Sequence, residues 1–195
     1  MLPWANGGIQ MGIFGWVFLA VLVLLIIFAI SIYNRLVRLR ALVKEGFSGI
    51  TVQLRRRADL IPNLVQTVQG YATHEREVFD EVTARRAEAT NAGSVEATAA
   101  ADAHMTGLLS RLFAVAEAYP ELRASDNFQQ LQAELSDIEG KIAIARQIYN
   151  DAVLSYDNAL ETVPTNVVAG MFNFEPRPYF EAEEAAVREA PSVRF

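Results

Sequence analysis

The sequence predicts an all-α protein, in which an N-terminal transmembrane helix continues into an elongated antiparallel four-helix bundle that ends in a non-helical C-terminal strap. Three observations support this fold class. The first 34 of the 195 residues carry no Asp, Glu, Lys or Arg. Apolar residues then recur at intervals of three and four, the spacing of one helical face. Residues 164–180 hold three prolines, which interrupt regular structure.

Residues 12–32 form an uninterrupted apolar run of 21 residues. As an α-helix the run is about 31 Å long, which matches a hydrocarbon core of about 30 Å. The alternative is a cleaved signal peptide, but that segment needs a basic start and a shorter apolar core. We therefore predict a retained transmembrane helix over 12–33, preceded by a short extracytoplasmic tail over 1–11.

Basic residues follow the apolar run, and none precedes it. Lys and Arg beside a transmembrane helix stay on the cytoplasmic side. We therefore expect a single-pass protein of the inner (cytoplasmic) membrane, with its N-terminus outside and its C-terminal domain in the cytoplasm. Anionic lipid attracts cations close to the membrane surface. The membrane-proximal basic residues are Arg35, Arg38, Arg40 and Lys44.

The net charge of −6 combines two opposite parts, because residues 35–58 carry a net +6 and residues 59–195 a net −12. Arg55, Arg56 and Arg57 lie about 35 Å beyond the apolar run along a straight helix, too far for lipid contact. We expect them to pair with acidic groups of protein. Those groups lie either within the bundle or on a neighbouring copy of the chain.

The bundle is expected to span residues 34–163. Its helices are predicted at about 34–71, 74–90, 94–119 and 126–163. The first continues the transmembrane helix without a stop signal, and Pro62 is expected to kink it by removing the hydrogen bond to the carbonyl of Ala58. Asp59 and Asn63 are candidates to satisfy the freed groups.

The last bundle helix has the most regular apolar pattern, with steps that alternate between three and four from Phe128 to Ala159. Such a heptad seam packs at about 20° against neighbouring helices. Its principal residues are Leu131, Leu135, Ile138, Ile142, Tyr149 and Tyr156. Asp126 is expected to cap this helix, with Gln129 three residues later as in a capping box.

The strap, residues 164–180, combines prolines with many apolar side chains. An isolated soluble domain rarely exposes so large an apolar patch, so we expect the strap to dock. It lies either along its own bundle or on another copy or partner. The strap contact candidates are Pro164, Asn166, Met171, Phe172, Phe174, Tyr179 and Phe180. Residues 181–195 are predicted to form a short acidic helix and a tail.

Residues for catalysis are scarce in this sequence. It contains no cysteine, which excludes disulfides, thiolate metal sites and cysteine nucleophiles. His74 and His104 lie 30 residues apart, and neither an HExxH zinc motif nor a glycine-rich nucleotide loop is present. We therefore expect no enzyme activity, no catalytic residue, no metal, no cofactor, no small-molecule substrate and no nucleic acid. His74 is expected to be a capping or surface group.

Several segments resemble the LemA family. Residues 33–38 read Tyr-Asn-Arg-Leu-Val-Arg, and residues 52–65 read Val-Gln-Leu-Arg-Arg-Arg-Ala-Asp-Leu-Ile-Pro-Asn-Leu-Val. Gly-Tyr-Ala-Thr-His-Glu at 70–75 and Ile-Tyr-Asn-Asp-Ala-Val at 148–153 extend the resemblance. The resemblance implies an anchored helical bundle with its N-terminus outside and no established catalytic activity. It marks as motif residues, for folding or for contact, Arg55, Arg56, Arg57, Asp59, Pro62, Asn63, His74 and Glu75.

Two classes of function fit these observations. The first is a structural membrane protein that self-associates through its cytoplasmic bundle and organises or curves the membrane. The alternative is an adaptor or regulator of another membrane protein, such as the membrane proteases with which some relatives are associated. The expected partners are therefore the lipid bilayer, other copies of this chain, and other membrane proteins.

Overall fold

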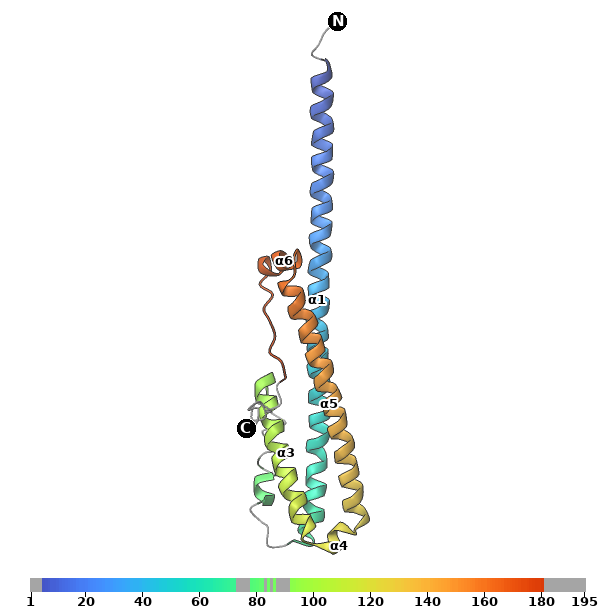
Figure 1. The fold of residues 1–195 in the computed structure, drawn as a ribbon, viewed down its shortest axis with the longest axis vertical. Helices are drawn as coiled ribbons and strands as arrows, with labels where there is room; N and C mark the ends of the chain where they lie inside the picture. Colours follow the sequence, from blue (N-terminus) through green and yellow to red (C-terminus); the bar gives the residue numbers. More distant parts are fainter. Residues whose placement is uncertain (1–4, 73–77, 83, 85, 87–91, 181–195) are drawn as a thin grey trace, which may run out of the picture. The chain divides into compact units, whose positions relative to one another are not determined.

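The computed structural model describes residues 5–72, 78–82, 84, 86 and 92–180, with side chains from residue 15 onward. Every regular element in these ranges is helical, and they contain no strand, which confirms the predicted all-α class (Figure 1). The helices are α1 (Ala5–Gln69), α3 (Val95–Glu117), α4 (Pro120–Arg123), α5 (Asp126–Glu161) and α6 (Thr165–Met171).

The described residues form two compact units. The first unit contains residues 5–41 and 155–176, and the second contains residues 42–154 and 177–180. Helices α1 and α5 each contribute residues to both units.

Helix α1 is the long apolar N-terminal helix that the sequence predicts. Within the described residues it is the one helix long and apolar enough to cross a membrane. It begins at Ala5, so residues 5–11, which we expected in the tail, are helical. Beyond Pro3 no proline interrupts this segment, so the helix of the apolar run extends through it.

Pro62 lies inside α1, and the helix continues past it to Gln69. The carbonyl of Ala58, which loses its helical donor at Pro62, accepts a hydrogen bond from Arg86 Nε at 3.0 Å. Arg86 Nη2 also lies 3.7 Å from Asp59 Oδ1. Arg86, which is distant in sequence, therefore donates to the Ala58 carbonyl, for which we expected Asp59 or Asn63 to be the partner.

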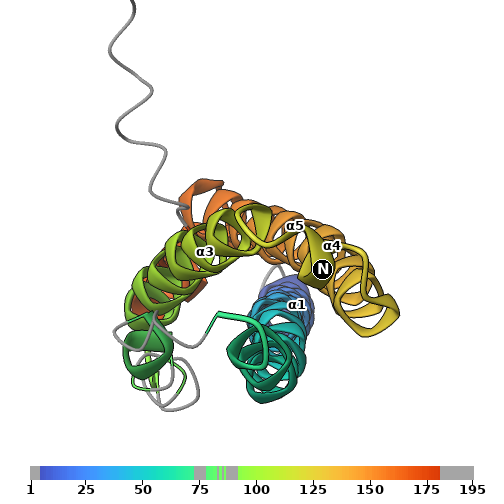
Figure 2. The same cartoon turned by 90° about the horizontal axis from the view of Figure 1, so that it is seen from below.

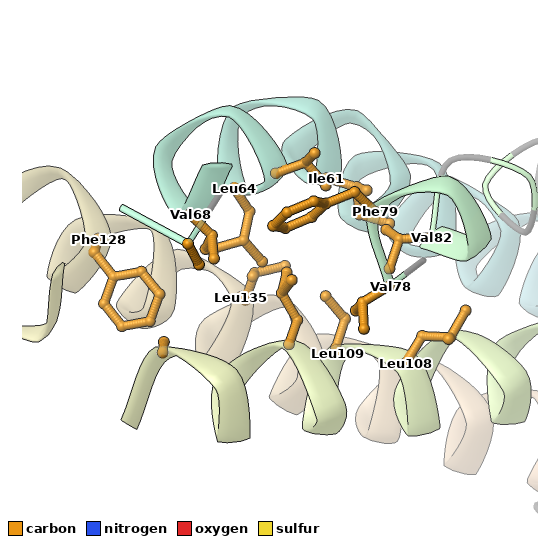
Figure 3. Close-up of a cluster of buried hydrophobic side chains, with 14 of the residues drawn as sticks. Ile61, Leu64, Val68, Val78, Phe79, Val82, Leu108, Leu109, Phe128 and Leu135 are labelled. Atoms are coloured by element: carbon orange, nitrogen blue, oxygen red, sulfur yellow. The ribbon is translucent and has the colours of Figure 1, made fainter. Parts of the chain in front are cut away.

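A large apolar cluster joins the helices of the second unit (Figure 3). Helix α1 supplies Ile61 and Leu64, α3 supplies Leu109, and α5 supplies Phe128. Phe79, from the helical residues 78–82, points its ring toward α1. In the end-on view, α1, α3 and α5 lie side by side around this core (Figure 2). Because all of these helices share the cluster, the core fixes their register.

Helices α1 and α5 approach each other closely at Gly46. A Cβ atom on Gly46 would lie 3.0 Å from the Cα of Tyr149, whereas a Cβ on Gly49 would meet nothing within 4 Å. The backbone of α5 therefore occupies the space that a side chain at position 46 would need. The ring of Phe47 lies 6.0 Å from that of Tyr149 beside this contact.

Polar residues define several helix ends. Ser94 caps α3, since its side chain accepts a hydrogen bond from the backbone N–H of Ala97. For α5 the predicted cap was wrong by one residue: Ser125 accepts from the N–H of Phe128 at 3.3 Å, and Asp126 is already helical. Pro120 ends α3 as expected but also begins α4, because a proline at the first helical position loses no hydrogen bond.

The prediction of a non-helical strap was wrong over Thr165–Met171, which form α6. Pro164 precedes the first helical residue, and the next proline is Pro176, so the intervening residues are free to form helical hydrogen bonds. Of the helix predicted at 74–90, residues 78–82, 84 and 86 are described, and all are helical. The short helix predicted after residue 180 lies outside the described residues.

Candidate functional site

The three consecutive arginines of the motif block, residues 55–63, lie in different environments. Arg55 and Arg56 are exposed, while Arg57 is 4% exposed. Successive residues of an α-helix point about 100° apart, so one face of α1 can bury only one of the three. Arg57 therefore contributes to the packing of the helices, whereas Arg55 and Arg56 lie on the outer surface of α1.

Arg57 is the centre of an ion network that joins three helices. Its Nη1 lies 2.9 Å from Asp102 Oδ1 of α3 and 3.1 Å from Glu139 Oε2 of α5. Its Nη2 donates to the hydroxyl of Thr106 at 3.1 Å. A guanidinium group presents several donors in a fixed plane, which suits it to partners on two neighbouring helices at once.

Asp102 is 2% exposed and contacts a second cation, because Arg146 of α5 pairs with its other carboxylate oxygen. The guanidinium of Arg146 also lies over the ring of Phe180, 5.3 Å from its centroid. Two arginines and two carboxylates therefore balance in charge within the second unit. Such a network holds helices in one arrangement, and removing its buried carboxylate, Asp102, takes a partner away from both arginines.

The remaining motif residues lie apart from this network. Asp59 and Asn63 are exposed, and Pro62 is half-buried. Asn63 lines an open groove of about 440 Å³ between α1 and α5. The other lining residues are Leu60, Gln66, Thr67, Asn127, Gln130, Leu131 and Glu134. His74 and Glu75 lie outside the described residues, and His104 is exposed on α3.

The end of the strap binds to α5 within the second unit. Asn150 forms two hydrogen bonds with the backbone of Phe180: Phe180 N–H donates to Oδ1 at 2.9 Å, and Nδ2 donates to the Phe180 carbonyl at 3.2 Å. Tyr149 donates its hydroxyl to the carbonyl of Pro178 at 2.7 Å. Tyr149 and Asn150, both from the family segment 148–153, therefore hold residues 178–180. Phe180 is buried, while Tyr179 stays exposed.

The beginning of the strap belongs to the first unit and packs on α1. Val168 and Ala169 are buried in a cluster with Ile32, Leu36 and Ala159. The ring of Tyr33 contacts those of Phe172 and Phe174, with centroids 4.8 and 5.7 Å apart. Pro164, Met171 and Phe172 are exposed, whereas Asn166 and Phe174 are half-buried.

The membrane-proximal basic residues all lie on the outer surface of α1. Arg35, Arg38, Arg40 and Lys44 are exposed. Arg40 also lies over the ring of Phe174, 5.0 Å from its centroid, so it contacts the strap within the first unit. These positions leave their charges available to solvent or to an anionic surface.

The seam of α5 faces inward. Leu135, Ile138, Ile142, Tyr149 and Tyr156 are buried, and Leu131 is half-buried. The opposite side of α5 is not uniformly polar, because Ile144 and Ile148 are 60% and 57% exposed. These two residues are four positions apart and therefore share one helical face.

The described residues offer little for catalysis or metal binding. Among them, no group of three or more His, Asp or Glu side chains is placed to hold a metal ion. The buried carboxylate of Asp102 is engaged by Arg57 and Arg146. The arrangement can therefore fix helices, present a charged surface and present apolar side chains.

Sequence reasoning missed four residues that organise this region: Arg86, Asp102, Glu139 and Asn150. For Asp102 a signal was present, since it lies three residues before Met105 on the apolar stripe of α3, where a charge requires a buried partner. Asn150 lies in the family segment 148–153, which marked the residue but not its partner. For Arg86 and Glu139 the sequence carries no comparable signal. Their partners lie 28 to 82 residues away in the chain.

Comparisons with known proteins agree on one family. The sequence model of the LemA family matches residues 46–195. The chain is 26% identical over 179 residues to magnetosome protein MamQ 2 of Paramagnetospirillum magneticum. It is 25% identical over the same length to magnetosome protein MamQ of Magnetospirillum gryphiswaldense. Each match covers 78% of this chain and 66% of the relative. It is also 27% identical over 156 residues to protein LemA of Metamycoplasma hominis, covering 77% of this chain and 69% of that one. The chain thus spans about two thirds of the MamQ relatives, and none of these names denotes an enzyme.

Proposed function

The chain belongs to the LemA family, and on this premise we propose that it is a structural membrane protein: α1 anchors it, and the second unit self-associates to organise or curve the membrane. The observation that carries the proposal is the uncharged apolar run of residues 12–32, which passes without a break into a helix of the packed second unit. Family membership and the MamQ relatives support a membrane-associated protein.

The proposal also includes the orientation of the chain in the membrane. Arg35, Arg38 and Arg40 directly follow the apolar run and are exposed, while no basic residue precedes it. Under the positive-inside rule the second unit lies in the cytoplasm and the N-terminus outside the inner membrane. A reporter enzyme fused to the C-terminus, active in the cytoplasm only, tests this orientation. Activity outside the cytoplasm would contradict it.

Self-association is supported by two features of the second unit. Ile144 and Ile148 form an exposed apolar pair on α5. Arg55 and Arg56 are exposed cations on a chain whose residues 59–195 carry a net −12. Apolar contact between copies would bury the isoleucine pair, and opposite charges would orient the approach.

The full-length chain in mild detergent tests this proposal by light scattering at low and high salt. We expect homo-oligomers that become smaller in high salt, because salt screens charge contacts between copies. The double variant Ile144→Ser/Ile148→Ser should reduce the oligomer further. The matched control is Leu154→Ser, which replaces another exposed apolar residue of α5 on a different face. A monomer at every salt concentration contradicts self-association.

An adaptor function is the second candidate, and the groove lined by Asn63 favours it. Asn63, Gln66, Asn127 and Gln130 supply side-chain amides that can donate and accept hydrogen bonds with an extended partner segment. Affinity capture from native membranes, with the wild-type chain and with Arg56→Glu, distinguishes the two candidates. A stoichiometric foreign protein supports the adaptor, and recovery of this chain alone supports the self-associating scaffold.

A further inference from the structure

The outer face of α6 and of the turn before it is apolar and exposed. Val163 is 79% exposed, Val167 61% and Met171 73%, and Phe172 beside them is exposed as well. Between Glu161 and Glu175 the sequence contains no charged residue. Exposed apolar side chains are ordinary when scattered, but here they are contiguous and free of charge, which marks a contact surface.

The inner face of α6 places this surface at one level of α1. Val168 and Ala169 pack against Ile32 and Leu36, and Phe172 contacts Tyr33. Ile32 is the last residue of the apolar run, and α6 follows the end of α5 beside this part of α1 (Figure 1). One helical turn rises about 5.4 Å, so α6 lies within about a turn of the point where α1 leaves the hydrocarbon core.

The side chains around α6 have the composition of a membrane interface. Tyr33 stands at the end of the apolar run, and aromatic residues of this kind prefer the headgroup level. Arg35, Arg38 and Arg40 follow on the exposed surface of α1. Cations within a few ångströms of an anionic leaflet are attracted to it.

We infer that α6 inserts Val163, Val167 and Met171 into the lipid interface of the leaflet where α1 leaves the bilayer, so that the chain contacts the membrane through two elements. This inference rests on the proposed membrane anchor. An amphipathic helix binds an interface by burying its apolar face while cations bind the headgroups, and the two parts are present here at one level. A second copy of the chain is the less favoured occupant, because lipid already surrounds α1 at this depth.

The absence of native cysteine allows each position to be probed alone. The full-length chain with one cysteine, labelled with the fluorophore NBD, is reconstituted into vesicles of equimolar phosphatidylcholine and phosphatidylglycerol that contain a shallow doxyl-lipid quencher. Val167→Cys and Met171→Cys report on α6. Leu25→Cys, in the apolar run, reports on the anchor, and Ser155→Cys, exposed on α5 in the same unit, is the control outside lipid.

We expect blue-shifted emission at positions 167 and 171, and quenching at least about threefold stronger than at Ser155. These sites are exposed, so the substitutions remove no packed contact, and circular dichroism verifies unchanged helix content. Labels at 167 and 171 that behave like the one at Ser155, with Leu25→Cys in lipid, overturn the inference and leave the anchor standing. Blue-shifted emission without quenching indicates a covering protein and also overturns it. A label at Leu25 outside lipid overturns the anchor itself.

Discussion

Both units are built on α1 and α5 and bury mainly apolar side chains, but among the described residues only the second unit also buries charged ones. Among its described side chains, the first unit buries apolar residues such as Leu36 and Val168 and one threonine, Thr165, and it exposes apolar ones such as Leu25 and Met171. The second unit exposes many charged groups and buries Arg57 and Asp102. Along α1 and α5 the buried residues recur mainly at intervals of three and four in both units. The units therefore differ in the charged residues that they bury and in the surface that they expose. Apolar exposure suits lipid, whereas a buried, paired charge suits a fold stabilised in water.

The largest effect is expected from Asp102→Ala, which leaves the buried Arg57 and the half-buried Arg146 without their shared carboxylate. Removing one partner of a buried ion pair costs about 3–5 kcal/mol of unfolding free energy. Urea titration of the full-length chain in detergent, followed by circular dichroism, measures the loss.

Asp137→Ala is the matched control, because Asp137 pairs with Lys141 on the exposed side of α5. An exposed pair of this kind contributes about 0.5 kcal/mol or less. Equal losses in the two aspartate variants would show that the ion network does not distinguish the second unit from an ordinary charged surface.

The second largest effect is expected at the close approach of α1 and α5. Gly46→Val places a branched side chain against the backbone of Tyr149, and such overpacking costs about 1–3 kcal/mol. Gly49→Ala, one helical turn away in open space, should instead stabilise the chain by about 0.5–1 kcal/mol, since alanine favours the helix over glycine. The same urea titrations measure both. A stable Gly46→Val chain would contradict the observed helix spacing.

An effect of similar size, confined to the end of the strap, is expected where residues 178–180 contact α5 in the second unit. Asn150→Ala removes both hydrogen bonds to the backbone of Phe180, which together contribute about 1–3 kcal/mol. Hydrogen exchange at the Phe180 amide should accelerate markedly, while the amides of α3 keep their protection. Asn158→Ala, an exposed residue of α5, is the control and should leave the Phe180 amide unchanged. Unaltered exchange in the Asn150 variant would show that the strap is held by other contacts.

Sequence reasoning recovered the features that depend on local pattern. The all-α class follows from intervals of three and four, and the long apolar helix follows from the uncharged run. The same reasoning failed at α6, because it treated the prolines of residues 164–180 as breakers throughout. Only their spacing shows that Pro164 and Pro176 leave room for a short helix between them.

The candidate site was recovered less completely than the fold. The sequence predicts that Arg55, Arg56 and Arg57 pair with acidic groups of protein. The spacing of the apolar residues, however, did not identify which of the three arginines is buried. Arg57 turns inward because Asp102 and Glu139 meet it from two other helices. The partner of the Ala58 carbonyl was missed for the same reason, since Arg86 lies 28 residues away. Contacts of this kind depend on how helices pack, which no single segment encodes.

The smallest effect is expected in the first unit, at the contact between Arg40 and Phe174. Arg40→Gln removes a cation–π contact at an exposed site, which contributes about 0.5–1 kcal/mol, but it leaves the apolar packing of Val168 on Leu36 intact. Hydrogen exchange over residues 165–174 should therefore accelerate only about two- to fivefold. Arg38→Gln removes an equal charge from the exposed surface and serves as the control. Arg40→Gln could instead accelerate exchange over α6 as strongly as Asp102→Ala destabilises the second unit. That result would mean that charge organises both units, and it would contradict the contrast between them.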